Sequence, residues 1–428
     1  MGKQKKVLIV GGGGREHAIA WKLKQSRHDP ELICAPGNVG IETLCRCEPV
    51  AAEDIEGLVR LAAQERPDIT VVGPEAPLAL GLTDGIEALG LKVFGPNKKC
   101  AQIEASKSFT KAFLKRHGIP TADYREYTDA GALRADIGIF GFPMVLKADG
   151  LAAGKGVIIA EDRAEAEAAV RALMESRAFG AAGDKVVVED YLKGIEASVL
   201  CFVDKSGIVA MEAAQDYKRI GDGDKGPNTG GMGTYSPSLA LDENAMSLVK
   251  RDILSKTFEG FRKDGLDFRG VLFAGLMLTA YGPKVVEFNN RFGDPETQSV
   301  LPRLKTDLYS IMEAVCEDRL SGIDIEWNNE LKTVTVIMAA GGYPDPYKKG
   351  DVISGLDGLP EGITVFHSGT KRNEAGDIVT AGGRVLGVLG TGATHEEARA
   401  MAYSGVSRIS YEGAVYRRDI GMVYNTLT

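Results

Sequence analysis

Long apolar runs and an excess of positive charge are both absent from this 428-residue sequence. No uninterrupted apolar stretch approaches the roughly 18 residues of a membrane-spanning helix, so we expect no membrane partner. The formal net charge of -8 at pH 7 disfavours broad electrostatic attraction to nucleic acid. With 44% hydrophobic and 26% charged residues, the sequence predicts a globular protein of several domains, in which a local basic pocket can still bind a phosphorylated small molecule.

Cysteine is also scarce. The six cysteines contain no CxxC pair and no zinc-ligand spacing, which indicates reduced and mostly structural thiols. No signal peptide is visible, because the apolar residues 7–10 are followed at once by glycines that suit the end of a strand. We therefore expect a cytoplasmic protein. No internal repeat or low-complexity tract is present.

Short β-branched runs alternate with helical patterns over residues 6–96, one helix being expected near 78–89. This alternation predicts a parallel sheet with covering helices. The first strand leads into the glycine turn 11–14, but Glu16 stands where a G-x-G-x-x-G dinucleotide motif needs its last glycine. A glycine turn before a helix still offers N–H groups to an anion, so we expect a substrate phosphate there. Asn38 and Glu75 lie in later loops that open at the same edge of the sheet.

A lysine and a glycine-rich loop follow in the next part of the chain. Lys147 ends an apolar strand, where its charge must be paired or must face a ligand. The loop 148–157 contains Gly150, Gly154, Lys155 and Gly156 and can fold over phosphates. It is not a Walker A loop, because Gly156 occupies the place of the required Ser or Thr. A flexible hairpin tip is the alternative interpretation.

Three further segments are candidates for ligand contacts. Lys107 and Lys111 share one face of a predicted helix over 106–117, although lysines so placed are usually solvated. Glu189, at the end of a strand over 185–192, and Glu196 suit contacts to ribose or to an adenine amine. The segment 221–237 has six glycines in seventeen residues and is predicted to be a long functional loop.

The stretch 284–298 is the strongest single candidate site. Side chains alternate along a strand, so Glu287 and Asn289 point to one face and Phe288 to the other. A carboxylate beside an amide oxygen suits Mg²⁺, which often takes few protein ligands when phosphates are present. Arg291 and Asp294 follow in a turn where their charges can reach a substrate. Taken alone, the pattern also fits an ordinary charged strand exit.

In this order, a strand-end lysine, a small-residue glycine loop, an acidic strand end and an E-x-N strand resemble the ATP-grasp superfamily. The whole chain is similar to its phosphoribosylamine-glycine ligase family of purine synthesis. The motifs that carry this similarity are GGGGREHAIAWKL, APGN, VGPEAPL, FGP, ASKSFTK, LKADGLAAGKGV, QDYKR, GPNTGGMGTYSP, EFNNRFGDPETQ and MAAGGYP. Two positions depart from the pattern: Gly12 stands where relatives often carry Asn, and the strand before Glu287 offers Gly275 in place of a second acid.

The resemblance implies an α/β and α+β multidomain fold. We expect an N-terminal parallel α/β domain over 1–105, a two-lobed ATP-grasp region over 106–325 with 122–193 as its mobile ATP lobe, and a β-rich C-terminal domain over 326–428. The implied reaction joins glycine to 5-phosphoribosylamine with ATP, through glycyl phosphate, and yields glycinamide ribonucleotide, ADP and phosphate. Another ATP-grasp ligase or a bicarbonate-using carboxylase is the alternative, and a non-catalytic nucleotide-binding protein is a weaker one.

The resemblance and the patterns above together assign residues to each ligand. Arg291, Asp294 and Lys147 are expected to be catalytic, and Glu287 and Asn289 to hold Mg²⁺ or Mn²⁺ with phosphates and water. The residues expected to bind ATP are Lys107, Lys147, Gly150, Gly154, Lys155, Gly156, Glu189, Tyr191, Leu192 and Glu196. The residues expected to bind glycine and phosphoribosylamine are Gly13, Gly14, Arg15, Glu16, Asn38, Glu75, Asp216, Lys218, Thr229, Gly230, Gly231 and Arg291.

Overall fold

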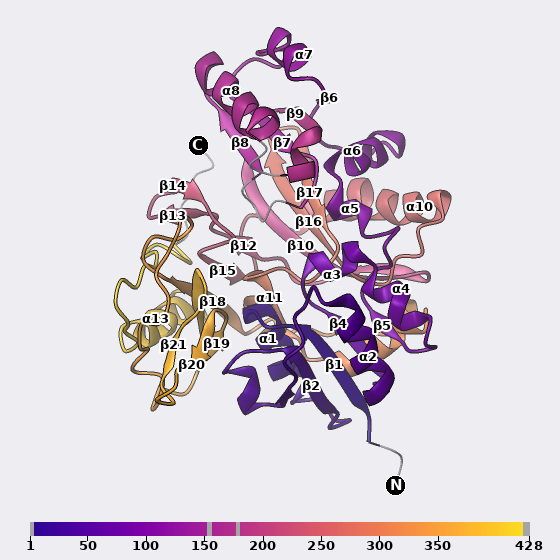
Figure 1. The fold of residues 1–428 in the computed structure, drawn as a ribbon. Helices are drawn as coiled ribbons and strands as arrows, with labels where there is room; N and C mark the ends of the chain where they lie inside the picture. Colours follow the sequence, from indigo (N-terminus) through magenta and orange to yellow (C-terminus); the bar gives the residue numbers. More distant parts are fainter. Residues whose placement is uncertain (1–3, 152–155, 177–179, 423–428) are drawn as a thin grey trace.

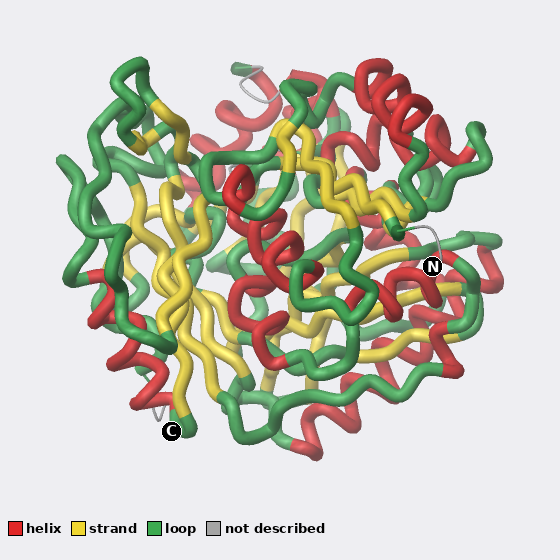
Figure 2. The backbone as a smooth tube through the Cα atoms, turned by 90° about the horizontal axis from the view of Figure 1, so that it is seen from below, coloured by secondary structure: helices red, strands yellow, loops and turns green. Residues whose placement is uncertain are grey.

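The computed structural model describes residues 4–151, 156–176 and 180–422. Its elements form a parallel N-terminal sheet, two antiparallel sheets in the middle of the chain, and a C-terminal antiparallel sheet (Figure 1). Seen from below, these sheets are separate layers with helices between and around them (Figure 2). The predicted mixture of α/β and α+β architecture is confirmed.

The N-terminal sheet has the strand order β3-β2-β1-β4-β5, and every pair in it is parallel. Its strands are β1 (Lys6–Gly11), β2 (Glu31–Pro36), β3 (Arg46–Cys47), β4 (Ile69–Val72) and β5 (Val93–Phe94). Its helices are α1 (Gly14–Leu23), α2 (Ile55–Glu65), α3 (Glu75–Leu80) and α4 (Leu82–Glu87). The prediction of a single helix near 78–89 is wrong, because the chain forms two helices there. Gly81 adopts a φ of +94° and separates α3 from α4.

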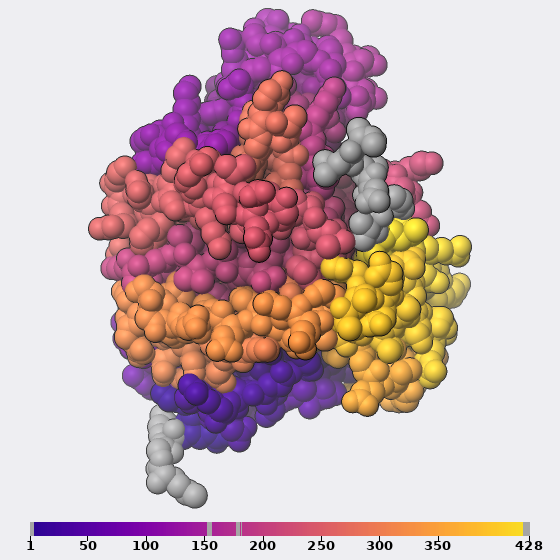
Figure 3. Space-filling view, turned by 180° about the vertical axis from the view of Figure 1, so that it is seen from behind, coloured from indigo at the N-terminus to yellow at the C-terminus, as the bar shows by residue number. Residues whose placement is uncertain are grey.

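The first middle sheet has the order β6-β9-β7-β8 and forms the lobe that stands farthest from the N-terminal sheet (Figures 1 and 3). Its strands are β6 (Tyr124–Tyr127), β7 (Met144–Ala148), β8 (Val157–Ala160) and β9 (Val186–Asp190). The helices α7 (Ala130–Ala135) and α8 (Arg163–Val170) belong to the same lobe, while α5 (Gln102–Ala105) and α6 (Lys107–Arg116) precede it. The hydroxyl of Ser106 accepts a hydrogen bond from the Phe109 N–H, which explains why α6 begins where it does.

The second middle sheet has the order β11-β10-β16-β17. Its strands are β10 (Ile195–Asp204), β11 (Gly207–Ala210), β16 (Gly270–Thr279) and β17 (Gly282–Asn289). The helices α9 (Glu243–Leu248) and α10 (Ser255–Asp264) are joined by one π-helical segment (Val249–Leu254) and pack on this sheet. β17 carries Glu287 and Asn289 toward the junction with the lobe.

The prediction of one long loop over 221–237 is wrong in part, since this segment contains strands. β13 (Arg219–Gly221) pairs with β14 (Lys225–Asn228), and β15 (Gly233–Ser236) enters the C-terminal sheet. That sheet has the order β12-β15-β18-β22-β19. The spacing of glycines hid these strands, because three short strands with glycine turns resemble an irregular loop in sequence.

The C-terminal sheet is built from β12 (Gln215–Asp216), β15, β18 (Lys332–Ala339), β19 (Ile363–His367) and β22 (Arg384–Gly392). Helix α13 (His395–Val406) covers it, and β20 (Thr370–Arg372) and β21 (Ile378–Thr380) form a separate hairpin. α11 (Glu296–Val300) and α12 (Leu308–Cys316) connect the middle of the chain to this domain and pack beside the N-terminal sheet. Among the described residues, no helix combines the length and the apolar character that crossing a bilayer requires.

Candidate active site

A cavity of about 1590 Å³ lies where these sheets meet. Its walls come from the carboxyl edge of the N-terminal sheet, the lobe, β17 and the C-terminal domain. Single small-molecule sites usually occupy ~300–1000 Å³. The cavity is therefore large enough for more than one substrate.

Most of the predicted site residues line this cavity. They are Arg15, Glu75, Lys107, Lys147, Gly150, Gly156, Glu189, Tyr191, Leu192, Glu196, Asp216, Lys218, Thr229, Gly230, Glu287, Asn289, Arg291 and Asp294. The predicted residues Gly13, Gly14, Glu16, Asn38 and Gly231 are not among those that line it. Gly154 and Lys155 fall outside the described residues.

The first glycine turn is tied down by its own side chains. Glu16 Oε2 accepts a hydrogen bond from the Gly13 N–H at 2.6 Å, and Glu16 Oε1 accepts one from Arg15 Nε at 2.6 Å. The amide nitrogen of Asn38 donates to the carbonyls of Gly12 and His367, and its oxygen accepts from the N–H groups of Gly40 and Ile41. These bonds use the hydrogen-bonding positions of the Asn38 amide, so its contact with substrate stays a prediction. Arg15, by contrast, reaches the cavity.

The departure at Gly12 has a local cause. A Cβ atom at this position would lie 2.4 Å from the main-chain oxygen of Gly37. The turn and the loop after β2 therefore approach each other more closely than any side chain at position 12 allows.

Three lysines and one glutamate lie together where the lobe meets α6. Lys147 Nζ lies 2.9 Å from Glu189 Oε1, as required by its buried position, and it also donates to the carbonyl of Val286 at 3.3 Å. Lys111 Nζ lies 2.9 Å from the other oxygen of Glu189. Although burial acts to raise the pKa of Glu189, the two lysines lower it overall. Lys107 donates to the carbonyl of Gly150 at 2.8 Å, and burial lowers its pKa.

Glu287 and Asn289 are adjacent on one face of β17. Asn289 Nδ2 lies 3.5 Å from Glu287 Oε1, and the Glu287 side chain is exposed within the cavity. Enclosure by the protein acts to raise the pKa of Glu287, but the charges of Lys218, Lys147 and Lys107 lower it overall, which keeps it ionised. An ionised carboxylate beside an amide oxygen fits a hard divalent cation. In the described part of the chain, no group of three or more His, Cys, Asp or Glu side chains is placed to hold a metal, so further ligands would come from substrate and water.

Arg291 is fixed by acids from two other elements. Its Nη2 lies 3.0 Å from Glu104 Oε1, and its Nε lies 3.3 Å from Glu75 Oε2. Burial raises the pKa of Glu104 to about 7, although Arg291 acts to lower it. Glu104 was not predicted, because it lies in the short helix α5, whose sequence has no special pattern. Only the fold brings it to Arg291.

A second cluster of charged side chains lies around Asp216 and Lys218, which are predicted to contact substrate. Lys218 Nζ lies 3.0 Å from Asp216 Oδ2, while Asp216 Oδ1 is buried without a hydrogen-bond partner. Burial and, after it, the charge of neighbouring Asp216 raise the pKa of Glu296 to about 7. Glu196 also faces the cavity, and enclosure raises its pKa. Asp216 lines the cavity, and its carboxylate is suited to accept a hydrogen bond from an ammonium group.

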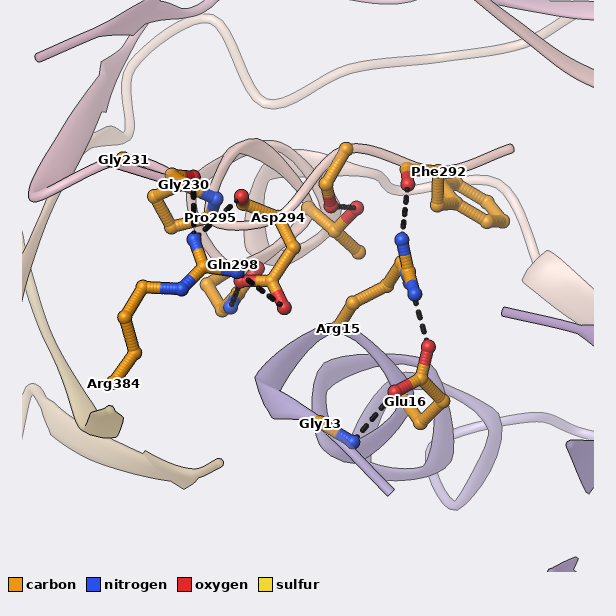
Figure 4. A network of polar contacts seen from close by, with 12 residues as sticks. Gly13, Arg15, Glu16, Gly230, Gly231, Phe292, Asp294, Pro295, Gln298 and Arg384 are labelled. Carbon is orange, nitrogen blue, oxygen red and sulfur yellow. Dashed lines mark hydrogen bonds and ion pairs between the residues drawn. The ribbon is translucent and has the colours of Figure 1, made fainter. Parts of the chain in front are cut away.

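The turn after β17 meets the C-terminal domain through Arg384, which the sequence did not indicate. Arg384 Nη1 donates to the carbonyls of Gly230 at 2.5 Å and Asp294 at 2.7 Å, and Nη2 lies 3.4 Å from Asp294 Oδ2. Arg15 donates to the carbonyl of Phe292 at 3.1 Å, so the two arginines approach this turn from opposite sides (Figure 4). Burial acts to raise the pKa of Asp294, but Arg384 and Arg15 lower it overall. Tyr343, also missed, accepts a hydrogen bond from the Gly230 N–H at 3.0 Å.

Two antiparallel sheets that enclose a strand-end lysine and a carboxylate–amide pair define an ATP-grasp enzyme. Comparison with known proteins agrees and is more specific. Profiles of the phosphoribosylglycinamide synthetase family match its N domain at residues 5–104, its ATP-grasp (A) domain at 105–297 and its C domain at 333–423. The chain belongs to this family, and it is an ATP-dependent ligase, as the sequence predicted.

Relatives that match 97% of this chain support this assignment. Phosphoribosylamine–glycine ligase from Xanthomonas axonopodis pv. citri is 49% identical over 419 residues, which cover 97% of each chain. The trifunctional purine biosynthetic protein adenosine-3 of Gallus gallus is 48% identical over 420 residues, 42% of its own length. The crystal structure of phosphoribosylamine–glycine ligase from Thermotoga maritima superposes with a TM-score of 0.83 at 34% identity and covers 97% of this chain and 99% of that one. A biotin carboxylase domain from Hydrogenobacter thermophilus shares the fold at 16% identity and a TM-score of 0.73.

Proposed function

We propose that this enzyme joins glycine to 5-phosphoribosylamine with conversion of ATP to ADP and phosphate, in the cytoplasm, as a step of purine (IMP) biosynthesis. One observation carries the proposal beyond the family assignment. A single cavity joins the lysines of the lobe, the pair on β17, and the edge of the N-terminal sheet where Arg15 and Glu75 lie. Three small molecules that must react in sequence need one continuous space of this kind.

The lobe side of the cavity suits ATP. Lys107 and Lys147 supply positive charge for the phosphates, and Glu189, Tyr191, Leu192 and Glu196 line the remaining space for the nucleoside. Glu287 and Asn289 would hold Mg²⁺ or Mn²⁺. When bound, such an ion neutralises negative charge on transferring phosphate oxygens.

The β17 side suits activation of glycine. A carboxylate is a poor electrophile until it is phosphorylated, so it must be held in line with the γ-phosphate. Arg291 is positioned by Glu104 and Glu75 and faces the cavity, where its fixed charge would neutralise the glycine carboxylate and the phosphoryl group. The carboxylate of Asp216, which lines the cavity, would accept a hydrogen bond from the glycine ammonium. The product of this step is glycyl phosphate.

The edge of the N-terminal sheet suits the amine substrate. Arg15 and Glu75 line the cavity there, with the turn that carries Asp294 between them and the C-terminal domain. The amine of phosphoribosylamine attacks the carbonyl carbon of glycyl phosphate, the C–O bond to phosphate breaks, and one N–H proton is lost. No side-chain nucleophile is required, since binding and orientation supply the acceleration.

Release of ADP, measured with each co-substrate omitted in turn, tests the proposal. We expect full turnover only with ATP, glycine, phosphoribosylamine and a divalent cation together, and glycinamide ribonucleotide as the product. Turnover that depends on bicarbonate instead of glycine would identify a carboxylase and contradict the proposal. An Arg15→Ala variant should mainly weaken use of phosphoribosylamine; a defect confined to ATP affinity would contradict the placement of that substrate.

A further inference from the structure

Lys111 is a buried cation that the reaction described above does not use. Only 3% of the residue is exposed, yet Lys111, on α6, is among the residues that line the cavity. Its Nζ lies 2.9 Å from Glu189 Oε2, while Lys147 Nζ lies 2.9 Å from Glu189 Oε1. Two lysines therefore share one buried carboxylate, and the three groups together carry one surplus positive charge.

Lys111 is also tied to the strand that carries the predicted metal ligands. Its Nζ donates to Thr121 Oγ1 at 2.8 Å, and Thr121 Oγ1 donates to the carbonyl of Val285 at 2.7 Å. The ring of Tyr124 lies 5.8 Å from the same nitrogen. These contacts fix the ammonium group at the junction of β9 and β17, so it cannot follow a ligand deeper into the cavity. Lys147, in contrast, holds its second partner, the carbonyl of Val286, only at 3.3 Å.

We propose that Lys111 is a positioning residue that neutralises Glu189 and so leaves Lys147 available to the phosphates of ATP. This inference rests on the proposed role of Lys147 as a phosphate contact. Before ATP binds, both lysines pair with Glu189, so neither is a buried unpaired charge. When the phosphates arrive, Lys147 turns toward them and Lys111 remains as the partner of Glu189.

Without the charge of Lys111, Glu189 and the phosphates of ATP would compete for Lys147. Lys147 would then be the one remaining lysine within ion-pair distance of Glu189 among the described residues. Movement of Lys147 to a phosphate would leave a buried carboxylate without a cation, which is strongly unfavourable. A purely structural role for Lys111 predicts instead a general loss of stability and turnover, without a selective effect on ATP.

Direct binding of ATP, together with steady-state kinetics, tests this inference. The variants are Lys111→Gln and Lys111→Arg, with Lys115→Gln as the matched control one turn later on the exposed face of α6. Lys111→Gln should weaken ATP binding about tenfold or more, because a carboxylate now competes for Lys147. Its KM for glycine should stay within about twofold, Lys111→Arg should retain most of the ATP affinity, and Lys115→Gln should match the wild type.

A double variant separates the charge effect from a folding defect. Glu189 also lines the space for the nucleoside, so the double variant is compared with Glu189→Gln alone. Without the carboxylate nothing competes for Lys147, so Lys111→Gln should change ATP affinity by no more than about threefold in the Glu189→Gln background. ATP affinity of Lys111→Gln within about twofold of the wild type, or an equally large loss of affinity in both backgrounds, would overturn the inference. Lys147→Ala tests the proposed role of Lys147 separately from the inference about Lys111. Unchanged ATP affinity in this variant would overturn the phosphate role of Lys147 and the inference with it. Weakened binding in Lys147→Ala but not in Lys111→Gln would overturn the inference alone.

Discussion

Arg384 donates a hydrogen bond to the main-chain carbonyl of Asp294 at 2.7 Å across 90 residues of sequence. The same guanidinium holds the carbonyl of Gly230, so one side chain of the C-terminal sheet fixes two segments of the cavity wall. We predict that Arg384→Ala reduces kcat/KM at least about tenfold and lowers the free energy of unfolding by about 1–3 kcal/mol, because Asp294 loses its main counter-charge. Arg372→Ala, at an exposed position of the same domain, should change neither quantity. Urea unfolding and steady-state assays check both values, and wild-type activity in Arg384→Ala would show that the contact does not organise the site.

Glu287 and Asn289 offer a second prediction, on the divalent cation. Glu287→Gln keeps the shape of the side chain but removes the charge that a cation requires. We expect turnover to fall by two orders of magnitude or more, or the half-saturating Mg²⁺ concentration to rise by a similar factor. Far-UV circular dichroism should be unchanged, because this side chain is exposed in the cavity and packs against no core cluster. A Mg²⁺ titration that superposes on that of the wild type would remove Glu287 from the metal site.

The sequence predicted the parts of the site that depend on local pattern. The alternation of side chains along β17 places Glu287 and Asn289 together, and an apolar strand that ends in Lys147 requires a partner or ligand for that charge. The parallel order of the N-terminal sheet likewise follows from alternating strands and helices.

Long-range partners could not be predicted in the same way. Glu104 meets Arg291, and Lys111 meets Glu189, only because separate elements of the fold pack together. The sequences around Glu104 and Lys111 show only the pattern of an ordinary surface helix. The strands β13, β14 and β15 were missed because their glycines suit turns and because β15 finds its partner, β18, about 100 residues later. Tertiary pairing, not local propensity, decides these elements.

Gly231 and Gly223 form a natural matched pair for the glycine-rich segment. Both have positive φ, +110° and +66°, but a Cβ at Gly231 would lie 2.5 Å from Pro295 Cδ and 2.7 Å from Asp216 Oδ1, whereas a Cβ at Gly223 would meet nothing within 4 Å. Gly223→Ala should cost only the backbone strain of about 1 kcal/mol. Gly231→Ala should cost more and should raise the KM for glycine, because Asp216 must move. Equal unfolding free energies and equal kinetics for the two variants would contradict this.

Glu296 provides a prediction on the pH dependence of stability. It is buried beside Asp216, and it also faces Lys218 and Arg291; burial and Asp216 raise its pKa from 4.5 to about 7. Because the folded chain binds this proton more tightly than the unfolded chain, the contribution of Glu296 favours folding at low pH and is lost as pH rises from 4.5 to about 7.

Glu296→Gln removes that dependence without changing the size of the side chain. Relative to the wild type, the variant should therefore gain about 1–3 kcal/mol of unfolding free energy between the two ends of this window. Urea unfolding at intervals of pH measures the gain, with exposed Glu374→Gln as the control that should follow the wild type. Parallel curves for Glu296→Gln and the wild type would show that folding does not raise the pKa of Glu296.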